Sequence, residues 1–148
     1  MSNQKVFGFD EATKALAALA SPKVRAGALL EIGLFGEAET KKHTPVDKGV
    51  LRASIGHVEA GGNSDDAVFT VDADSVMWGT NVHYAPWIED GFTMATRRLV
   101  NLPGIGWRWV SPFSYTGAHM FEKGLATAAH ASKAIFSAHI EMAAGGLA

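Results

Sequence analysis

The sequence predicts an α+β fold, in which a small antiparallel sheet packs against a long helix of the N-terminal half and a C-terminal helix. Long segments near both ends space their apolar residues as helices do, whereas short alternating segments in the middle are typical of strands. Turn residues separate these segments. The 148 residues suffice for one domain with its own core, so we expect a single domain over 1–148.

Two helices are predicted before residue 44. Asp10 can cap a short helix over about 10–20, and Ser21-Pro22 favours the start of a long helix over about 22–43. The apolar stripe of the long helix comprises Leu30, Ile32, Leu34, Phe35 and Ala38. A glycine inside a helix costs about 1 kcal/mol relative to alanine. We therefore expect the three internal glycines either to break the helix or to allow another backbone to approach closely: Gly27, Gly33 and Gly36.

The middle of the chain predicts three strands. Thr44-Pro45 ends the long helix, the turn over 46–49 reverses the chain, and Leu51 to Val58 is expected to be a strand. A flexible loop is predicted over 60–66, rich in glycine and acids. Two alternating segments then predict a hairpin with its turn at 72–75; they span 67–72 and 76–82.

The C-terminal part begins with a short helix or turn over 84–90 and a mixed, aromatic insertion over about 92–116. Within the insertion, residues 99–100 can pair with residues 107–110 around a Pro-Gly turn. A last helix is predicted from about 118 to 142. Its stripe comprises Phe121, Leu125, Ala128, Ser132, Ile135, Phe136 and His139, and we expect His139 to be packed and hydrogen-bonded.

Charge is segregated along the chain, although the net charge of −2 argues against a general DNA-binding protein. Residues 53–96 hold seven acids and no Lys or Arg, whereas residues 97–108 hold three arginines and no acid. This pattern fits two solvated surfaces of opposite sign. It also fits a molecule with an acidic surface and a basic surface, through which copies of the chain stack on one another.

Catalytic patterns are missing from the sequence. Without cysteine, disulfides and thiol catalysis are excluded, and the six histidines show no metal-ligand spacing. The acids near residues 65–74 lack the order of an EF-hand loop. The longest apolar run is broken by Glu31 and is too short to span a membrane, and the N-terminus has no secretory pattern. We expect no enzyme activity, no cofactor and no metal.

Aromatic residues predict a partner surface. The chain has 8 Phe, 4 Trp and 2 Tyr, and nine of these fourteen lie between Trp78 and Phe121. Trp, Tyr and Arg dominate interface hot spots, although one of the tryptophans could instead fill a core. Strand alternation puts Trp107 and Trp109 on one face and Arg108 on the other. The predicted interface residues are Trp87, Arg97, Arg98, Trp107, Arg108 and Trp109.

Three ordered segments carry a family resemblance. Residues 44–55 read TPVDKGVLRASI, residues 79–91 read GTNVHYAPWIEDG, and residues 117–125 read GAHMFEKGL. Together they resemble signatures of the minor tail or neck (tail-completion) proteins of long-tailed bacteriophages, the siphophages. The matching fold-motif residues are Pro45, Asp47, Gly49, Leu51, Arg52, Gly79, Asn81, Tyr84 and Pro86. The chain departs from the family at Lys48, at Met120 and in its longer aromatic insertion.

The resemblance implies a structural virion protein of the head–tail junction, assembled in the bacterial host cytoplasm. It implies a homo-oligomeric ring, expected to be hexameric, that joins head-closure or connector proteins to the tail terminator or tail tube. Genome DNA would pass through the lumen without specific binding, and no membrane would be involved. From the charge pattern we expect the acidic stretch to face the passing DNA or a basic partner, without binding DNA. The alternatives are a tail-terminator or head-closure ring of the same junction, and a small metal- or nucleotide-dependent enzyme.

Overall fold

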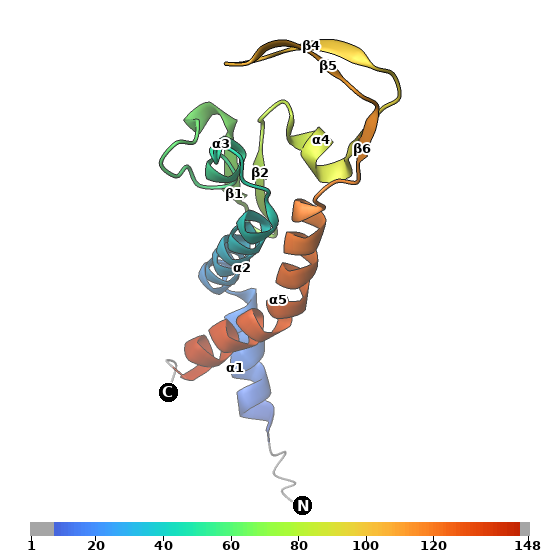
Figure 1. Ribbon diagram of the computed structural model, residues 1–148. Coiled ribbons are helices and arrows are strands. Elements are labelled where there is room, and N and C mark those ends of the chain that lie inside the picture. Colours follow the sequence, from blue (N-terminus) through green and yellow to red (C-terminus); the bar gives the residue numbers. More distant parts are fainter. Residues whose placement is uncertain (1–7, 146–148) are drawn as a thin grey trace, which may run out of the picture.

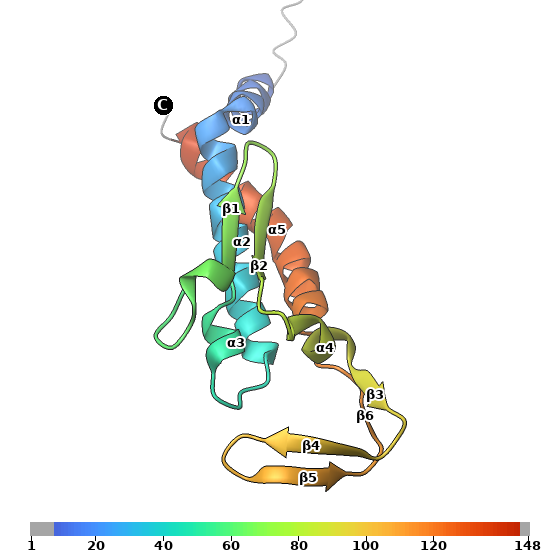
Figure 2. The same ribbon diagram turned by 90° about the horizontal axis from the view of Figure 1, so that it is seen from above.

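The computed structural model describes residues 8–145 (Figure 1). The elements are α1 (Phe9–Ala20), α2 (Pro22–His43), α3 (Val50–Ala53), η1 (Ser64–Asp66), β1 (Ala67–Val71), β2 (Val76–Thr80), α4 (Ala85–Asp90), β3 (Phe92–Met94), β4 (Arg98–Leu102), β5 (Gly106–Val110), β6 (Phe113–Tyr115) and α5 (Met120–Gly145). The α+β class is confirmed, with the hairpin β1–β2 against the long helix α2 and with α5 beside it (Figures 1 and 2). The strands form three separate two-stranded sheets rather than one sheet.

The glycines of α2 do not break the helix, and the groups that approach them are side chains rather than another backbone. A Cβ on Gly33 would overlap Val76 and Phe69 of the hairpin, and a Cβ on Gly36 would overlap the indole of Trp78. The hairpin therefore lies directly on the backbone of α2. Its register pairs residues 67–71 with residues 76–80, which confirms the predicted hairpin and its turn.

Of the predicted apolar stripe of α2, only Ile32 is buried, and the rest of the stripe is wrong as a core face. Leu30 and Leu34 are 43% and 45% exposed, and Ala38 is exposed as well. The buried face consists of small and polar residues together with one large apolar residue: Ala28, Ile32, Gly33, Gly36, Glu37, Thr40 and Lys41. Small side chains face inward because they let the hairpin and α5 approach the helix backbone, which the leucines would prevent.

The strand predicted over 51–58 is also wrong. Residues 50–53 form the short helix α3, which starts after Gly49 in the left-handed conformation at φ +80°. Leu51 and Ile55 are both buried, and so are Ala53 and Ser54 between them. A strand with Leu51, Ala53 and Ile55 facing inward would point Ser54 outward, but Ser54 is fully buried. The backbone N–H of Ser54 instead donates to the carbonyl of Val50 at 3.1 Å, as in a helical turn.

The loop over 60–66 is anchored rather than free. The backbone N–H of Asn63 donates to Ser54 Oγ at 3.0 Å, and the N–H of Gly62 donates to the carbonyl of Glu59 at 2.9 Å. A Cβ on Gly62 would overlap the carbonyl of Ala53. The glycine predicted to give flexibility instead allows the loop to lie against the α3 segment.

The insertion over 92–116 forms an arm. Strands β3 and β6 pair at its base, and β4 pairs with β5 in the register Leu99↔Trp109 and Asn101↔Trp107, as the sequence predicted. The β4–β5 ribbon projects from the end of the body formed by the rest of the chain (Figures 1 and 2). Helix α5 carries the predicted stripe with Ala128 buried, but Leu125 is 61% exposed. Within the described residues, no helix has the length and apolarity to cross a membrane.

Candidate functional site

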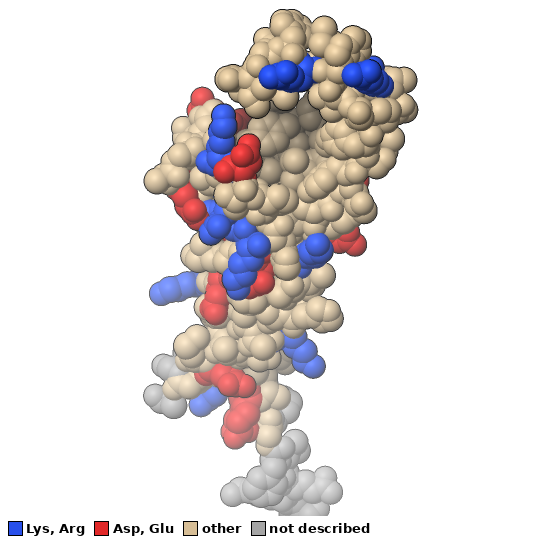
Figure 3. All heavy atoms as spheres, in the orientation of Figure 1, with Lys and Arg blue, Asp and Glu red and all other residues tan. Residues whose placement is uncertain are grey.

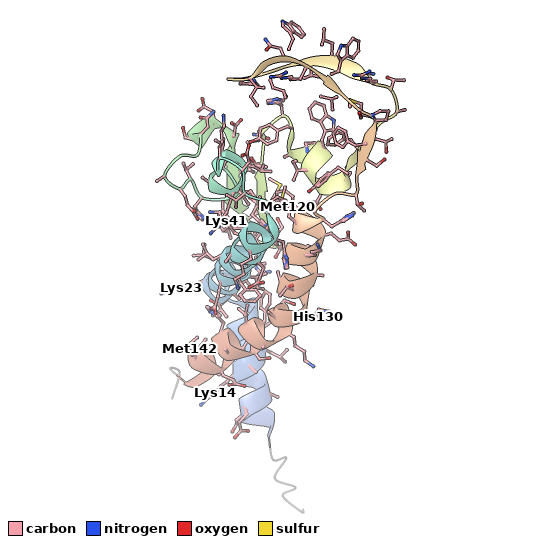
Figure 4. All side chains as sticks on the ribbon, in the orientation of Figure 1. Lys14, Lys23, Lys41, Met120, His130 and Met142 are labelled. Atoms are coloured by element: carbon pink, nitrogen blue, oxygen red, sulfur yellow. The ribbon has the colours of Figure 1, made fainter. Side chains whose placement is uncertain are left out.

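The three sequence motifs meet in one core. Leu51 and Ile55 come from the first motif, Val82 and Ala85 from the second, and Met120 from the third. Figure 4 labels Met120 at the start of α5, where its side chain is fully buried. Partly buried hydrophobic residues surround this cluster: Trp78, Tyr84, Ile88, Ala118 and Phe121. The motif residues therefore serve to join three distant segments into one body.

Other motif residues shape the turns between these segments. Pro45 follows the C-terminus of α2, Pro86 lies in the first turn of α4, and Tyr84 precedes α4. The carbonyl of Gly79 accepts from the N–H of Gly56 at 2.9 Å, and the N–H of Asn81 donates to the carbonyl of Asp66 at 2.6 Å. Asp47 and Arg52 are exposed. The first two motifs also line a surface hollow of about 470 Å³ next to Leu51 and Ile88.

Glu89 joins the second motif to the third. Its carboxylate oxygens accept from the backbone N–H groups of Phe121 and Glu122 at 3.1 and 3.2 Å. The first N–H groups of a helix have no partner within the helix, and an anion there is favoured by the helix dipole. Glu89 thus caps α5 from another element, a role that the sequence did not reveal because the cap is remote in the chain.

Two glycines form the base of the arm. Gly91 and Gly117 have φ values of +84° and +93°, and a Cβ on either would overlap the backbone next to the other. The chain therefore leaves and re-enters the body through one tight crossing. Beyond it, the rings of Phe92 and Phe113 contact edge-to-face at 5.3 Å, which packs β3 against β6.

The arm has two unlike faces. Directly opposite residues of an antiparallel pair lie on the same face, so Trp107 and Trp109 share one face with Leu99 and Asn101. Trp107 is 66% exposed and Trp109 is 60% exposed. The guanidinium carbon of Arg97 lies 5.1 Å from the centre of the Trp109 ring, in a cation–π contact. We call this surface the aromatic face of the arm.

The predicted interface residues do not all lie together. Arg98 and Arg108 lie on the opposite face of the ribbon, beside the half-buried Val100 and Val110. Trp87 is on α4 in the body, and with Arg98 it lines a hollow of about 620 Å³ beneath the arm. Figure 3 shows the surface hollowed between arm and body. The structure brings Arg97, Trp107 and Trp109 together and separates them from the other predicted interface residues.

Charge is less segregated in space than in sequence. Among the acids of residues 53–96, Glu59 forms an ion pair with Lys41, Asp74 forms one with Arg25, and Glu89 caps α5. In Figure 3 the visible face of the body carries both signs, whereas the arm carries only cations. The arm is therefore a positive pole, but the body is not a uniform negative one.

A buried ionic network was not found from the sequence. Lys41 Nζ donates to Glu37 Oε1 at 2.8 Å, to Glu59 Oε1 at 2.8 Å and to the carbonyl of His57 at 3.0 Å. His57 contacts Glu37 with its ring Nδ1 at 2.7 Å and its backbone N–H at 3.0 Å. Figure 4 labels Lys41 near the end of α2. A Cβ on Gly56 would overlap the carboxylate of Glu37, so the loop closes tightly over the network.

The network shifts the pKa values of its central pair. Burial would raise the pKa of Glu37, but hydrogen bonds from Lys41 and His57 outweigh burial, and the pKa lies below its usual value. Burial would lower the pKa of Lys41, but hydrogen bonds to Glu37 and Glu59 outweigh it, and the pKa is raised. Both groups are therefore held in their charged forms, which suits a structural clamp.

The histidines take structural positions. His139 contacts Glu31 at 2.8 Å and its ring packs against Gly27, which confirms the packed, hydrogen-bonded histidine expected from the sequence. His119 lies 3.2 Å from Glu122, and the ring of His83 is edge-on to that of Tyr84. Among the described residues, no group of three or more His, Asp or Glu side chains could hold a metal ion.

Comparison with known proteins finds no match: no protein-family model, no curated protein and no solved structure is significantly similar to this chain.

Proposed function

We propose that the protein is a structural subunit of a bacteriophage virion. Copies of it would form a ring at the head–tail junction, between head-closure or connector proteins and the tail terminator or tail tube. The observation that carries the proposal is the arm, which extends two largely exposed indoles and an arginine away from the body. Exposed Trp and Arg side chains on a projecting element are typical of hot spots that a partner buries.

The motif segments, which lie in the body, support the same function. Their residues form the core, the cap of α5 and the crossing at the base of the arm. Residues so placed specify a fold that holds the arm in a defined direction. This agrees with the resemblance to neck and tail-completion proteins, whose signatures these segments resemble.

The test is to find the chain in virions. An antibody against the chain should label each purified particle at a single position, the neck. Mass spectrometry of the particles should detect the chain. Its absence from purified particles would contradict the proposed function. The position of the label relative to the connector and the tail tube separates a neck ring from a tail terminator or a head-closure ring.

A variant of the arm tests the observation itself. Trp107→Ala with Trp109→Ala should leave heads and tails unjoined, because truncating a hot-spot residue to alanine costs about 2 kcal/mol or more of binding free energy. Leu16→Ala is the matched control, since Leu16 is 67% exposed on the distant helix α1. Normal particles with the double variant would show that the arm does not make the joining contact.

We expect genome DNA to pass through the ring without binding tightly to the protein. The arginines of the arm suit carboxylates of protein partners, so we expect no salt-sensitive affinity of the free protein for duplex DNA in an anisotropy titration. Sub-micromolar binding that weakens steeply with salt, and that Arg97→Ala with Arg98→Ala abolishes, would instead place the arm against DNA.

A further inference from the structure

The body has an apolar groove that could receive an aromatic side chain. It lies between β2 and α5, has a volume of about 320 Å³ and is lined by Val76, Met77, Trp78, Phe121, Glu122 and Leu125. Met77 and Leu125 are 56% and 61% exposed. Two such side chains on facing elements form an exposed apolar surface, and surfaces of this kind mark interaction sites.

The floor of the groove is held in place from behind. The indole N–H of Trp78 donates to Thr40 Oγ1 at 3.0 Å, and its ring lies on the backbone of Gly36. Phe121 packs on the core cluster, and its backbone N–H is held by Glu89. A surface ordered in advance loses less conformational entropy when a partner docks.

Charges at the groove complement those of the arm. Glu122 is 75% exposed beside Phe121, and among the described residues it forms no ion pair with a Lys or Arg. On the arm, Arg97 lies over the ring of Trp109, and residues 92–116 contain no acid. Arg97 beside Trp109 can thus pair with Glu122 beside Phe121. This charge pair favours one orientation of docking.

The arm that fits this groove belongs to another copy. Figures 1 and 2 show the β4–β5 ribbon beyond α4 at one end of the body, whereas β2 and α5 run along its length. The arm is tied at its base by the crossing of Gly91 and Gly117. Within one chain the ribbon and the groove therefore lie apart.

We propose that the aromatic face of the arm of one copy docks into the β2–α5 groove of a second copy. Trp107 and Trp109 cover the apolar groove, and Arg97 pairs with Glu122. Donor and acceptor are different surfaces, so each copy can give one arm and receive another; such a contact builds a ring if it closes and a filament if it does not. The proposal rests on the proposed function for its setting, a multi-copy assembly.

Disulfide trapping tests the contact without background, because the chain contains no cysteine. Asn101→Cys places a thiol on the aromatic face and leaves both indoles intact, and Met77→Cys places one at the edge of the groove. When the two purified variants are mixed and oxidised, we expect a disulfide-linked heterodimer. Asn101→Cys mixed with Leu16→Cys is the control, and equal yields in the two mixtures would overturn the proposal.

A charge exchange makes the test specific. Adding Arg97→Glu to the arm copy, or Glu122→Arg to the groove copy, should lower the heterodimer yield about tenfold, as expected for the loss of one interfacial ion pair. Mixing the copy with Arg97→Glu and the copy with Glu122→Arg should restore the yield. Thermal unfolding of each variant checks that the body is folded. Failure of the restoration would show that Arg97 and Glu122 do not meet.

The outcomes also separate this inference from the proposed function. Particles can be made with both the Asn101→Cys and the Met77→Cys copies and then oxidised. If the chain lies at the neck but no disulfide-linked heterodimer forms, the arm-in-groove contact is overturned and the proposed function stands. A heterodimer from purified protein together with the absence of the chain from virions would overturn the function and leave the contact standing.

Discussion

The body and the arm use their tryptophans in opposite ways. Trp78 of the body is half-buried, packs on Gly36 and donates a hydrogen bond to Thr40. Trp107 and Trp109 of the arm are more than half exposed and lie on a ribbon of two strands. The comparison indicates that contacts within the body stabilise the fold, whereas the apolar surface of the arm is available to a partner.

The two regions also differ in the range of their contacts. The core joins segments that are far apart in the sequence, whereas the arm is one continuous segment of residues 92–116 that pairs with itself. A two-stranded hairpin is marginally stable on its own in water. We therefore expect changes in the body to lower the stability of the whole protein and changes in the arm to leave that stability nearly unchanged.

The largest expected effect comes from the buried network of the body. Lys41→Met removes the cation from the buried carboxylate of Glu37 and should lower the free energy of unfolding by about 3–5 kcal/mol, as for other broken buried pairs. Urea unfolding measures the loss. Replacing both residues, with Glu37→Met added, should cost less than Lys41→Met alone; an equal or larger loss would show that packing rather than the unpaired charge is responsible.

A smaller effect is expected where α5 touches α2. A Cβ on Gly124 would overlap Thr40 Oγ1, so Gly124→Ala should destabilise the protein by about 1–3 kcal/mol, as overpacking generally does. Gly145→Ala on the same helix is the control, because a Cβ there meets nothing within 4 Å. Equal melting temperatures for the two variants would mean that the helices are not in close contact.

The pH dependence of the body should follow from Glu37. Its pKa is lowered in the folded state, so its stabilising contribution is present above the ordinary value of 4.5 and is lost as the pH falls through the folded-state pKa. The free energy of unfolding should therefore fall more steeply below pH 4.5 in the wild type than in Glu37→Gln. Parallel curves for the two proteins in acid would contradict the buried pairing.

The smallest expected effect comes from shortening the arm. Met94 and Phe113 are opposite each other, so residues 95–112 can be replaced by Asn-Gly, which favours a two-residue hairpin turn. The stability of the body should change by no more than about 0.5 kcal/mol, the range of surface changes. A shift of several degrees in melting temperature would show that the ribbon supports the body, and the contrast between the two regions would not hold.

Local patterns in the sequence determined much of the fold. Helices α1, α2 and α5, the β1–β2 hairpin and the pairing of β4 with β5 follow from periodicity and turn residues, which act over a few neighbouring residues. The predicted cap of α1 by Asp10 is wrong, because the helix starts at Phe9 and Asp10 lies in its first turn. The same alternation put Trp107 and Trp109 on one face of the arm and Arg108 on the other. These are the parts of the molecule in which local preference and tertiary packing agree.

Tertiary structure alone decided which surfaces are buried. The leucine stripe of α2 had the right spacing for a core face, yet the hairpin packs on Gly33 and Gly36, and α5 packs on Thr40, because small residues let them come close. The Glu37–Lys41 pair of the same helix is covered by residues 56–59. Leu51, Ala53 and Ile55 alternate as in a strand, but a helical turn after Gly49 buries Ser54 together with them. The cap from Glu89 and the place of Arg97 over Trp109 likewise depend on residues that meet only in the folded chain.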